Sequence, residues 1–363
     1  MRNTFGNNIS LTLFGESHGE MIGAVIDGLA AGIKIDTDYI NKRIELRKPH
    51  GAISTKRREA DEIRIVSGLV GGITTGTPLT ILIENKNANS KDYSYLKDTP
   101  RPSHADYVAE VKYGGNQDFR GGGHFSGRLT APIVAAGAIL QQVLESKGVY
   151  IGTHIKNLHG VTDRDFNDMK EDIDLLGQKL FPVLDEGCEK KMTEEILNAA
   201  KCGDSVGGVL ETALIGLPAG IGEPWFDSLE STLSHVLFSI PGVKGVEFGL
   251  GFGFADRLGS EANDAFRTDG EKIFTATNNN GGINGGISNG MPMIFRTAVR
   301  PTPSIFKEQM TVSLSKMENT SLTIEGRHDP AIIHRARAVV DALTAIAIAD
   351  AIAVAYGSSY LGG

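Results

Sequence analysis

The last long segment of the chain, residues 331–356, restricts the fold more than any other feature of the sequence. It is rich in Ala, Ile and Val, and its polar residues lie mostly near its start. A helix that is apolar nearly all round must be buried on most of its faces. The segment therefore predicts a long helix inside a core or a subunit interface.

The other periodic segments predict both strands and helices. Apolar runs typical of strands occupy residues 9–13, 22–28, 63–68, 79–83, 206–217 and 245–254. Helical spacing occurs at residues 36–46, which Asp36 or Thr37 can cap, and at residues 130–147, where Thr130 can serve as the cap. Residues 9–28 are expected to form a hairpin.

Several stretches show no such periodicity. Residues 84–126 are polar with Gly, Pro and Tyr, and predict a long loop of the kind that is usually functional. Residues 161–204 are acidic and helix-prone, and predict a surface insertion. Because no repeat or linker divides the 363 residues, we expect a single domain over residues 1–363.

Composition excludes several classes of function. The formal net charge of −8 argues against nucleic-acid binding, which needs a broad cationic face. The two cysteines, Cys188 and Cys202, make neither a disulfide framework nor a zinc site, and we expect no metal. The N-terminus lacks the apolar core of a signal peptide, and the longest apolar stretch, residues 342–349, is too short to span a bilayer. The sequence predicts a soluble, cytoplasmic protein without membrane or nucleic-acid partners.

One segment departs from the acidic average. Residues 43–59 hold six basic and two acidic side chains, a net charge of +4. Such a patch fits a small, highly anionic ligand better than a polymer.

Loops rich in Gly, His, Arg and Asp recur along the chain. They are Gly15-Glu16-Ser17-His18-Gly19, Arg101-Pro102-Ser103-His104-Ala105-Asp106, Arg120-Gly121-Gly122-Gly123-His124-Phe125-Ser126-Gly127-Arg128 and Gly326-Arg327-His328-Asp329-Pro330. Glycine permits positive φ and lets a ligand approach the backbone closely. We expect these loops to converge on one active site, and the Asn/Gly-rich loop 278–290 offers further backbone donors.

Three of these loops also have another interpretation. Residues 15–19 match the G-x-S-x-G elbow of serine hydrolases, but the following residues resemble a strand where an elbow needs a helix. Asp329 and Pro330 suit the start of the last helix, so their role could be structural. His104 could be a solvated loop histidine, or Asp106 could orient it for proton transfer near neutral pH.

Taken together, the order and spacing of these motifs resemble the chorismate synthase family over residues 5–356. The resemblance implies an α+β fold, a single-domain β-α-β sandwich with long central helices between two antiparallel sheets, and a homotetramer. It also implies conversion of 5-enolpyruvylshikimate 3-phosphate to chorismate and phosphate by anti-1,4-elimination. Reduced FMN would be required although the reaction is redox-neutral, and NADPH is a possible indirect reductant.

The resemblance assigns roles to matching residues. His18 would donate a proton to the departing phosphate, His104 would keep the reduced flavin protonated near N1, and Asp329 would assist proton removal at flavin N5, with Ser17 and Ser126 relaying. The substrate anions would be bound by Arg47, Lys48, Arg101 and Arg128. The flavin site would comprise His124, Phe125, Ser126, Pro241, Gly242, Gly285, Arg300, Pro301, Thr302, Pro303, Ser304 and Arg327.

The sequence departs from the family pattern at three places. Ser103 replaces a usual glycine, and His124, Phe125 and Leu129 stand where the family usually has an arginine, a serine and a glutamate. Residues 49–61 are one residue shorter than usual and lack an arginine near Ala52 that is often linked with NADPH. A divergent relative that binds FMN but acts on another anionic substrate is therefore the main alternative, and a serine hydrolase a remote one.

Overall fold

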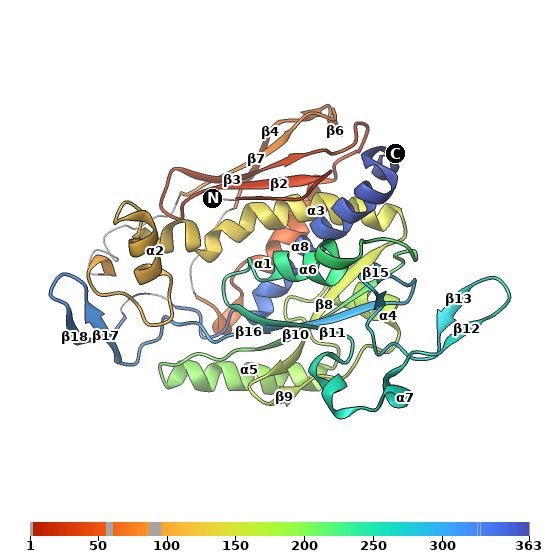
Figure 1. Cartoon of the computed structure of the whole chain (residues 1–363). Coiled ribbons are helices and arrows are strands. Elements are labelled where there is room, and N and C mark those ends of the chain that lie inside the picture. The colour runs from red at the N-terminus through yellow and green to blue at the C-terminus, as the bar shows by residue number, and fades with distance from the viewer. Residues whose placement is uncertain (1–2, 56–60, 87–95, 325, 327, 363) are drawn as a thin grey trace.

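Two antiparallel sheets enclose a layer of long helices (Figure 1). The computed structural model describes residues 3–55, 61–86, 96–324, 326 and 328–362. The first sheet has the order β1-β2-β3-β7-β4, with β1 at Thr4–Phe5, β2 at Ser10–Gly15, β3 at Met21–Asp27, β7 at Leu79–Glu84 and β4 at Ile63–Ser67. The second has the order β11-β16-β10-β8-β9, with β11 at Val243–Phe248, β16 at Met293–Val299, β10 at Gly208–Ile215, β8 at Tyr150–Leu158 and β9 at Val161–Thr162.

The helices and the small hairpins complete the element order. The helices are α1 (Thr37–Arg47), α2 (Asp106–Tyr113), α3 (Thr130–Ser146), α4 (Met169–Leu176), α5 (Glu186–Lys201), α6 (Leu229–Leu237), α7 (Gly259–Ala262) and α8 (Ile333–Tyr356). The paired short strands are β5 (Leu69–Val70) with β6 (Ile73–Thr74), β12 (Phe266–Thr268) with β13 (Ile273–Thr275), β14 (Ile283–Asn284) with β15 (Ile287–Ser288), and β17 (Gln309–Ser313) with β18 (Glu318–Leu322).

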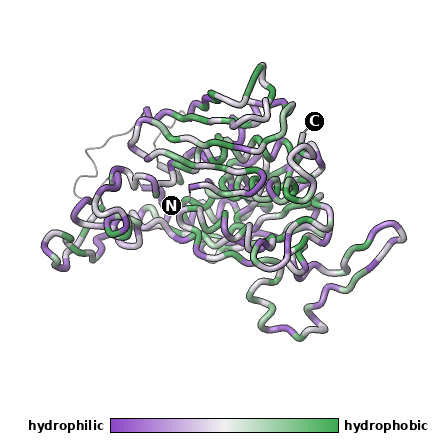
Figure 2. The backbone as a smooth tube through the Cα atoms, turned by 45° about the horizontal axis from the view of Figure 1, so that its top comes forward, coloured by the Kyte–Doolittle hydropathy of each residue, from purple (hydrophilic) through white to green (hydrophobic). Residues whose placement is uncertain are grey.

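The long helix α8 confirms the prediction from its composition. Apart from a few residues near its C-terminal end, nearly all of α8 is buried, and it belongs to a core cluster that extends from Ile9 to Leu361. It crosses α3 at very short range, since a Cβ on Gly137 would lie 2.3 Å from the Cβ of Ala342. Both α8 and residues 127–146 are long and apolar enough to cross a membrane, but 83% of each apolar window is buried inside the protein. Their hydrophobicity is therefore that of core helices, and green, hydrophobic stretches of the backbone crowd the middle of the molecule in Figure 2.

The predicted N-terminal hairpin is confirmed. Strands β2 and β3 pair antiparallel with Ser10 opposite Asp27 and Gly15 opposite Ile22, so residues 16–20 form the turn at one end of the first sheet. Because a strand follows Ser17, the turn lacks the helix that a hydrolase elbow requires.

Three details of the sequence-based prediction are wrong. Residues 106–113 form helix α2 within the expected loop, and its apolar Val108 and Val111 are exposed, so no buried periodicity marked it. Thr130 does not cap α3; its hydroxyl donates to Gly127 O at 2.6 Å, and the helix starts at Thr130 itself. Asp329 does not cap α8, which begins at Ile333.

Residues 161–204 pack against the second sheet. Helix α4 lies against β8, and α5 lies on the side of that sheet away from α3 in Figure 1. The segment contributes Ile173, Leu176, Met192 and Ile196 to the buried interior. That it is an insertion relative to other proteins stays a prediction.

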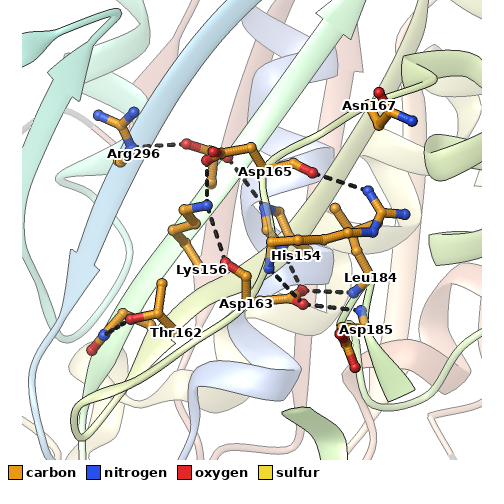
Figure 3. Close-up of polar contacts among 12 residues, drawn as sticks. His154, Lys156, Thr162, Asp163, Asp165, Asn167, Leu184, Asp185 and Arg296 are labelled. Atoms are coloured by element: carbon orange, nitrogen blue, oxygen red, sulfur yellow. Dashed lines mark hydrogen bonds and ion pairs between the residues drawn. The ribbon is translucent and has the colours of Figure 1, made fainter. Parts of the chain in front are cut away.

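A buried ionic cluster fastens this segment to the sheet (Figure 3). His154 of β8 is fully buried; its Nδ1 lies 2.9 Å from Asp163 Oδ2 and its Nε2 lies 3.3 Å from Glu211 Oε1 of β10. The other oxygen of Glu211 accepts from Arg296 Nε at 2.8 Å. Asp163 also accepts from the backbone N–H groups of Leu184 and Asp185, at 2.6 and 2.9 Å.

Candidate active site

A cavity of about 920 Å³ lies between the two sheets, beside the central helices α3 and α8. Its lining includes residues from β1 and β2, from the loop after α1, from residues 121–130, from the segments flanking β11 and β16, and from α8. The predicted site residues among them are Arg47, His104, His124, Phe125, Ser126, Arg128, Pro241, Gly242, Arg300, Pro301, Thr302, Pro303, Ser304 and Asp329. Segments more than 280 positions apart in the sequence therefore meet at one cavity, although Ser17 and His18 of the first motif do not line it.

Other predicted residues lie elsewhere. Lys48 pairs with Glu45 at the end of its own helix and does not line the cavity. Gly285 lies in the β14–β15 hairpin, also outside the cavity lining. Arg101 is buried beside the cavity, and Arg327 lies outside the described residues. Direct ligand contacts for these residues stay predictions.

The described basic residues of the expected cationic patch, residues 43–59, do not share one surface. Arg43 donates to Tyr39 OH at 2.7 Å and pairs with Glu145, away from the cavity. Of the described basic residues in this segment, only Arg47 lines the cavity, and Lys56, Arg57 and Arg58 lie outside the described residues.

The turn that carries Ser17 and His18 is fastened from two sides. Ser17 N donates to Gly123 O at 3.1 Å, and His124 Nδ1 donates to Gly15 O at 2.8 Å. Because a carbonyl only accepts, this contact fixes the proton of His124 on Nδ1. The side-chain amide of Asn85 donates to Glu16 O and Gly19 O, at 3.0 and 2.9 Å.

The glycine run 121–123 passes between His18 and His104. A Cβ on Gly121 would lie 2.7 Å from Cε1 of His18, and one on Gly122 would lie 3.3 Å from Cε1 of His104. Both glycines have positive φ, 58° and 84°. No larger residue fits between the two imidazoles without moving one of them.

His104 is oriented by a buried carboxylate. Its Nδ1 lies 2.6 Å from Asp106 Oδ1, and Arg101 binds both oxygens of Asp106 at 2.8 Å. Burial lowers the pKa of His104, although Asp106 opposes the effect. The hydrogen bonds from Arg101 and His104 outweigh burial and hold the pKa of Asp106 well below its usual range. The lowered pKa favours the neutral imidazole at pH 7, and in the tautomer whose Nδ1 donates to Asp106 the lone pair lies on Nε2.

Three other predicted residues, Asp329, Ser126 and Arg300, make hydrogen bonds to main-chain groups or to a charged side chain. Asp329 accepts from Thr55 N at 2.9 Å and from Arg335 Nη1 at 2.6 Å. Ser126 Oγ accepts from Arg128 N at 3.2 Å. Arg300 donates through Nη2 to Ser103 O at 2.8 Å.

Ser103, which replaces a usual glycine of the resembled family, has a φ of 59°. This left-handed conformation explains the preference for glycine there.

Part of the cavity wall was not predicted from the sequence. Phe5, His235, Phe238 and Lys244 also line it, and the rings of Phe5 and His235 meet edge-on at 5.5 Å. Phe5 lies on β1, His235 and Phe238 lie at the C-terminal end of α6, and Lys244 lies on β11. Lys244 follows Val243 at the start of β11, and its position next to the predicted Pro241–Gly242 pair and within the run Val243-Lys244-Gly245 was a signal in the sequence.

The lining residues fit a flavin better than a metal ion. Within the described part of the chain, no three His, Cys, Asp or Glu side chains are grouped as metal ligands. The cavity combines aromatic rings, imidazoles and proline-rich backbone. Among the described residues, the buried Nε of Arg300 has no hydrogen-bond partner, so it remains a donor for an anionic or carbonyl group.

Comparison with known proteins agrees with the site. The family model for chorismate synthase matches residues 9–353. The chain is 46% identical over 345 residues to a chorismate synthase of Thermococcus gammatolerans, covering 95% of this chain and 96% of that protein. It is 46% identical over 353 residues to a chorismate synthase of Methanobrevibacter smithii, covering 96% of each.

The fold agrees as well. A solved structure described as "Crystal Structure of Chorismate Synthase" matches with a TM-score of 0.77 and 26% identity, over 97% of this chain and 94% of the other. The predicted α+β sandwich is confirmed by this match and by the two antiparallel sheets around α8. Because the family model and these relatives cover nearly its whole length, the chain belongs to the chorismate synthase family and is an enzyme of the lyase class.

Proposed function

We propose that the protein converts 5-enolpyruvylshikimate 3-phosphate to chorismate and phosphate by anti-1,4-elimination, in the presence of reduced FMN. The observation that carries this proposal is the convergence of Arg47, Arg128, His104, His124 and Asp329 on one cavity. The substrate bears a phosphate and two carboxylates, a charge of about −3.5 to −4. Guanidiniums bind both kinds of anion through paired hydrogen bonds.

Arg47 and Arg128 are proposed to bind the substrate anions, and His18 to protonate the departing phosphate. Both guanidiniums are buried in the cavity wall, where charge-assisted hydrogen bonds are strong. His18 is packed against Gly121, directly behind the wall. Ser17, its neighbour on the same turn, is proposed as a proton relay.

The proposed flavin site consists of His124, Phe125, Ser126, Pro241, Gly242 and residues 300–304. A reduced flavin supplies electron density to the breaking C–O bond and a site for the released ring proton. Nε2 of neutral His104 would accept a hydrogen bond from a protonated N1 position and so favour that form. The carboxylate of Asp329, held by Arg335 and Thr55, would assist proton removal, with Ser126 relaying.

Arg101 is proposed to act mainly through His104, because its guanidinium already binds both oxygens of Asp106. NADPH is proposed only as an indirect source of electrons.

We also propose a soluble, cytoplasmic homotetramer. The exposed apolar side chains of Phe252, Phe266 and Ile273, on and near the β12–β13 hairpin that projects from the body in Figure 2, favour a protein interface.

The first test is turnover. Purified protein, incubated anaerobically with photoreduced FMN and the enolpyruvyl ester, is expected to form chorismate, followed by its absorbance. Reactions without flavin or with oxidised flavin are the controls. FMN binding without product would favour a divergent relative with another anionic substrate, and turnover without any flavin would contradict the proposal.

Gly121→Ala tests the packing of His18. We expect turnover to fall about 10-fold or more, because the new Cβ displaces His18 and Ser17 from their positions. Left-handed backbone at a non-glycine residue also costs about 1–2 kcal/mol of stability. Gly148→Ala is the matched control: its φ is 80°, but nothing lies within 4 Å of its Cβ. Equal turnover in the two variants, measured with thermal unfolding of each, would refute the steric explanation.

A further inference from the structure

Asp61 lies between the two guanidiniums of the cavity wall. Its side chain is 0% exposed; Oδ2 lies 3.2 Å from Arg47 Nη1, and Oδ1 accepts from Arg128 Nη1. Its backbone has a φ of 45°, a conformation that residues with side chains rarely adopt. Such a conformation persists only where the surroundings enforce it.

The two arginines come from unrelated elements. Arg47 ends α1, and Arg128 lies in the turn just before α3. Two guanidiniums at such short range of one another repel unless an anion lies between them. Asp61 supplies that anion and, through its two oxygens, sets how the guanidiniums face each other.

Further contacts connect this pair to the Ser17–His18 turn. Arg47 Nε donates to Thr130 Oγ1 at 2.8 Å. Arg128 Nε donates to Asn85 Oδ1 at 3.0 Å, and the amide nitrogen of Asn85 donates to Glu16 O and Gly19 O. One guanidinium thus contacts both the carboxylate of Asp61 and the amide that holds the turn.

We infer that Asp61 and Asn85 are positioning residues, which hold Arg47, Arg128 and the Ser17–His18 turn as one anion-binding unit. The inference rests on the proposed function only in that the ligand is a polyanion carrying phosphate. Asp61 reduces the positive charge of the site, so charge alone would make it an obstacle to anion binding. Positioning and simple charge therefore predict opposite effects when Asp61 is neutralised.

The variant Asp61→Asn distinguishes positioning of the guanidiniums from a simple effect of charge. We expect its affinity for inorganic phosphate, measured by calorimetry without flavin at low salt, to fall about 10-fold or more as the guanidiniums lose their common anchor. We expect KM for the enolpyruvyl ester to rise by a similar factor with a smaller change in kcat. Asp61→Glu, which restores the charge, is expected to recover part of the phosphate affinity. Unchanged or tighter phosphate binding by Asp61→Asn would overturn the inference.

Asp172→Asn is the matched control. Asp172 is another buried carboxylate paired with an arginine, Arg164, but it lies on α4 outside the cavity lining. This variant is expected to bind phosphate as the unaltered protein does. An equal loss of affinity there would mean that general destabilisation, not positioning, weakens binding, and would overturn the inference.

Asn85→Ala decides the question if Asp61→Asn does not fold. It removes the acceptor of Arg128 Nε and the two hydrogen bonds to the turn, and we expect phosphate affinity to fall several-fold while the fold, followed by circular dichroism, is kept. Normal phosphate affinity in this variant would overturn the inference. Because phosphate binding needs no turnover, a protein that binds phosphate but forms no chorismate would refute the proposed function alone.

Discussion

Replacing His104 with alanine is expected to lower turnover by about 10²–10⁴-fold while the protein remains folded. His104 lines the cavity and is oriented by Asp106, so its loss removes an imidazole whose Nε2 is fixed for proton handling. Turnover is measured anaerobically with photoreduced FMN, and folding by thermal unfolding. His159→Ala is the control, because His159 is exposed and pairs with Glu195 away from the cavity. Near-normal turnover by His104→Ala would remove this residue from the mechanism.

The same residue predicts a pH dependence. Burial lowers the pKa of His104, so it stays neutral at pH 7 and takes up a proton only below its ordinary value of 6.5. If neutral His104 is the working form, kcat is expected to be flat above that pH and to fall in more acidic solution. In Asp106→Asn the fall of kcat is expected to move to lower pH, because the variant lacks the carboxylate that raises the pKa of His104. An unchanged profile in that variant would contradict the assignment.

The second large effect is expected on stability, in His154→Gln. The substitution leaves the buried carboxylates of Asp163 and Glu211 without their shared cation, and removing one partner of a buried ionic pair costs about 3–5 kcal/mol. Chemical unfolding in urea measures the change. His159→Gln, which alters an exposed pair with Glu195, is expected to cost no more than about 1 kcal/mol. Similar losses in the two variants would contradict the importance of burial.

The His154 cluster also makes stability depend on pH. Burial alone would lower the pKa of His154, but hydrogen bonds to Asp163 and Glu211 outweigh it and raise the pKa. A raised pKa means that the folded protein holds the proton more tightly than the unfolded chain does. The stabilisation is therefore complete below pH 6.5 and is lost as pH rises through the folded value. His154→Gln is expected to lack this decline on the alkaline side.

Local patterns predicted the parts of the fold in which burial leaves a regular trace. Strands β2 and β3 are short runs rich in apolar residues, and α8 is apolar nearly all round, so all three were predicted from the sequence. Helix α2 was missed because its apolar side chains, Val108 and Val111, face solvent, and only Ala109 is buried. Apolar periodicity indicates which faces of an element are buried, so a helix that buries few side chains shows little periodicity.

The active site, like the fold, was predicted only where the sequence carries a local pattern. The glycine-rich motifs indicated which segments meet, but not the partners of each side chain. Arg101 was expected to bind an anion, and the anion it binds in the structure is Asp106, five residues along. Asp61 and Asn85 belong to no motif, and their importance arises from contacts with residues 14 to 69 positions away. Such contacts depend on the tertiary structure, so no local pattern reveals them.

The close crossing of α3 and α8 has a consequence for how this catalytic apparatus can evolve. Gly137 and Ala342 fix the separation of two helices whose N-terminal ends carry, or directly follow, cationic side chains of the cavity: Arg128 precedes α3, and Arg335 lies in the first turn of α8. A bulkier residue at the crossing would act as a wedge and spread those cations, although it would lie in the hydrophobic interior. The substitutions that the enzyme tolerates at this buried crossing are thus limited by the chemistry at the N-terminal ends of α3 and α8. Selection for activity would therefore favour small residues at the crossing.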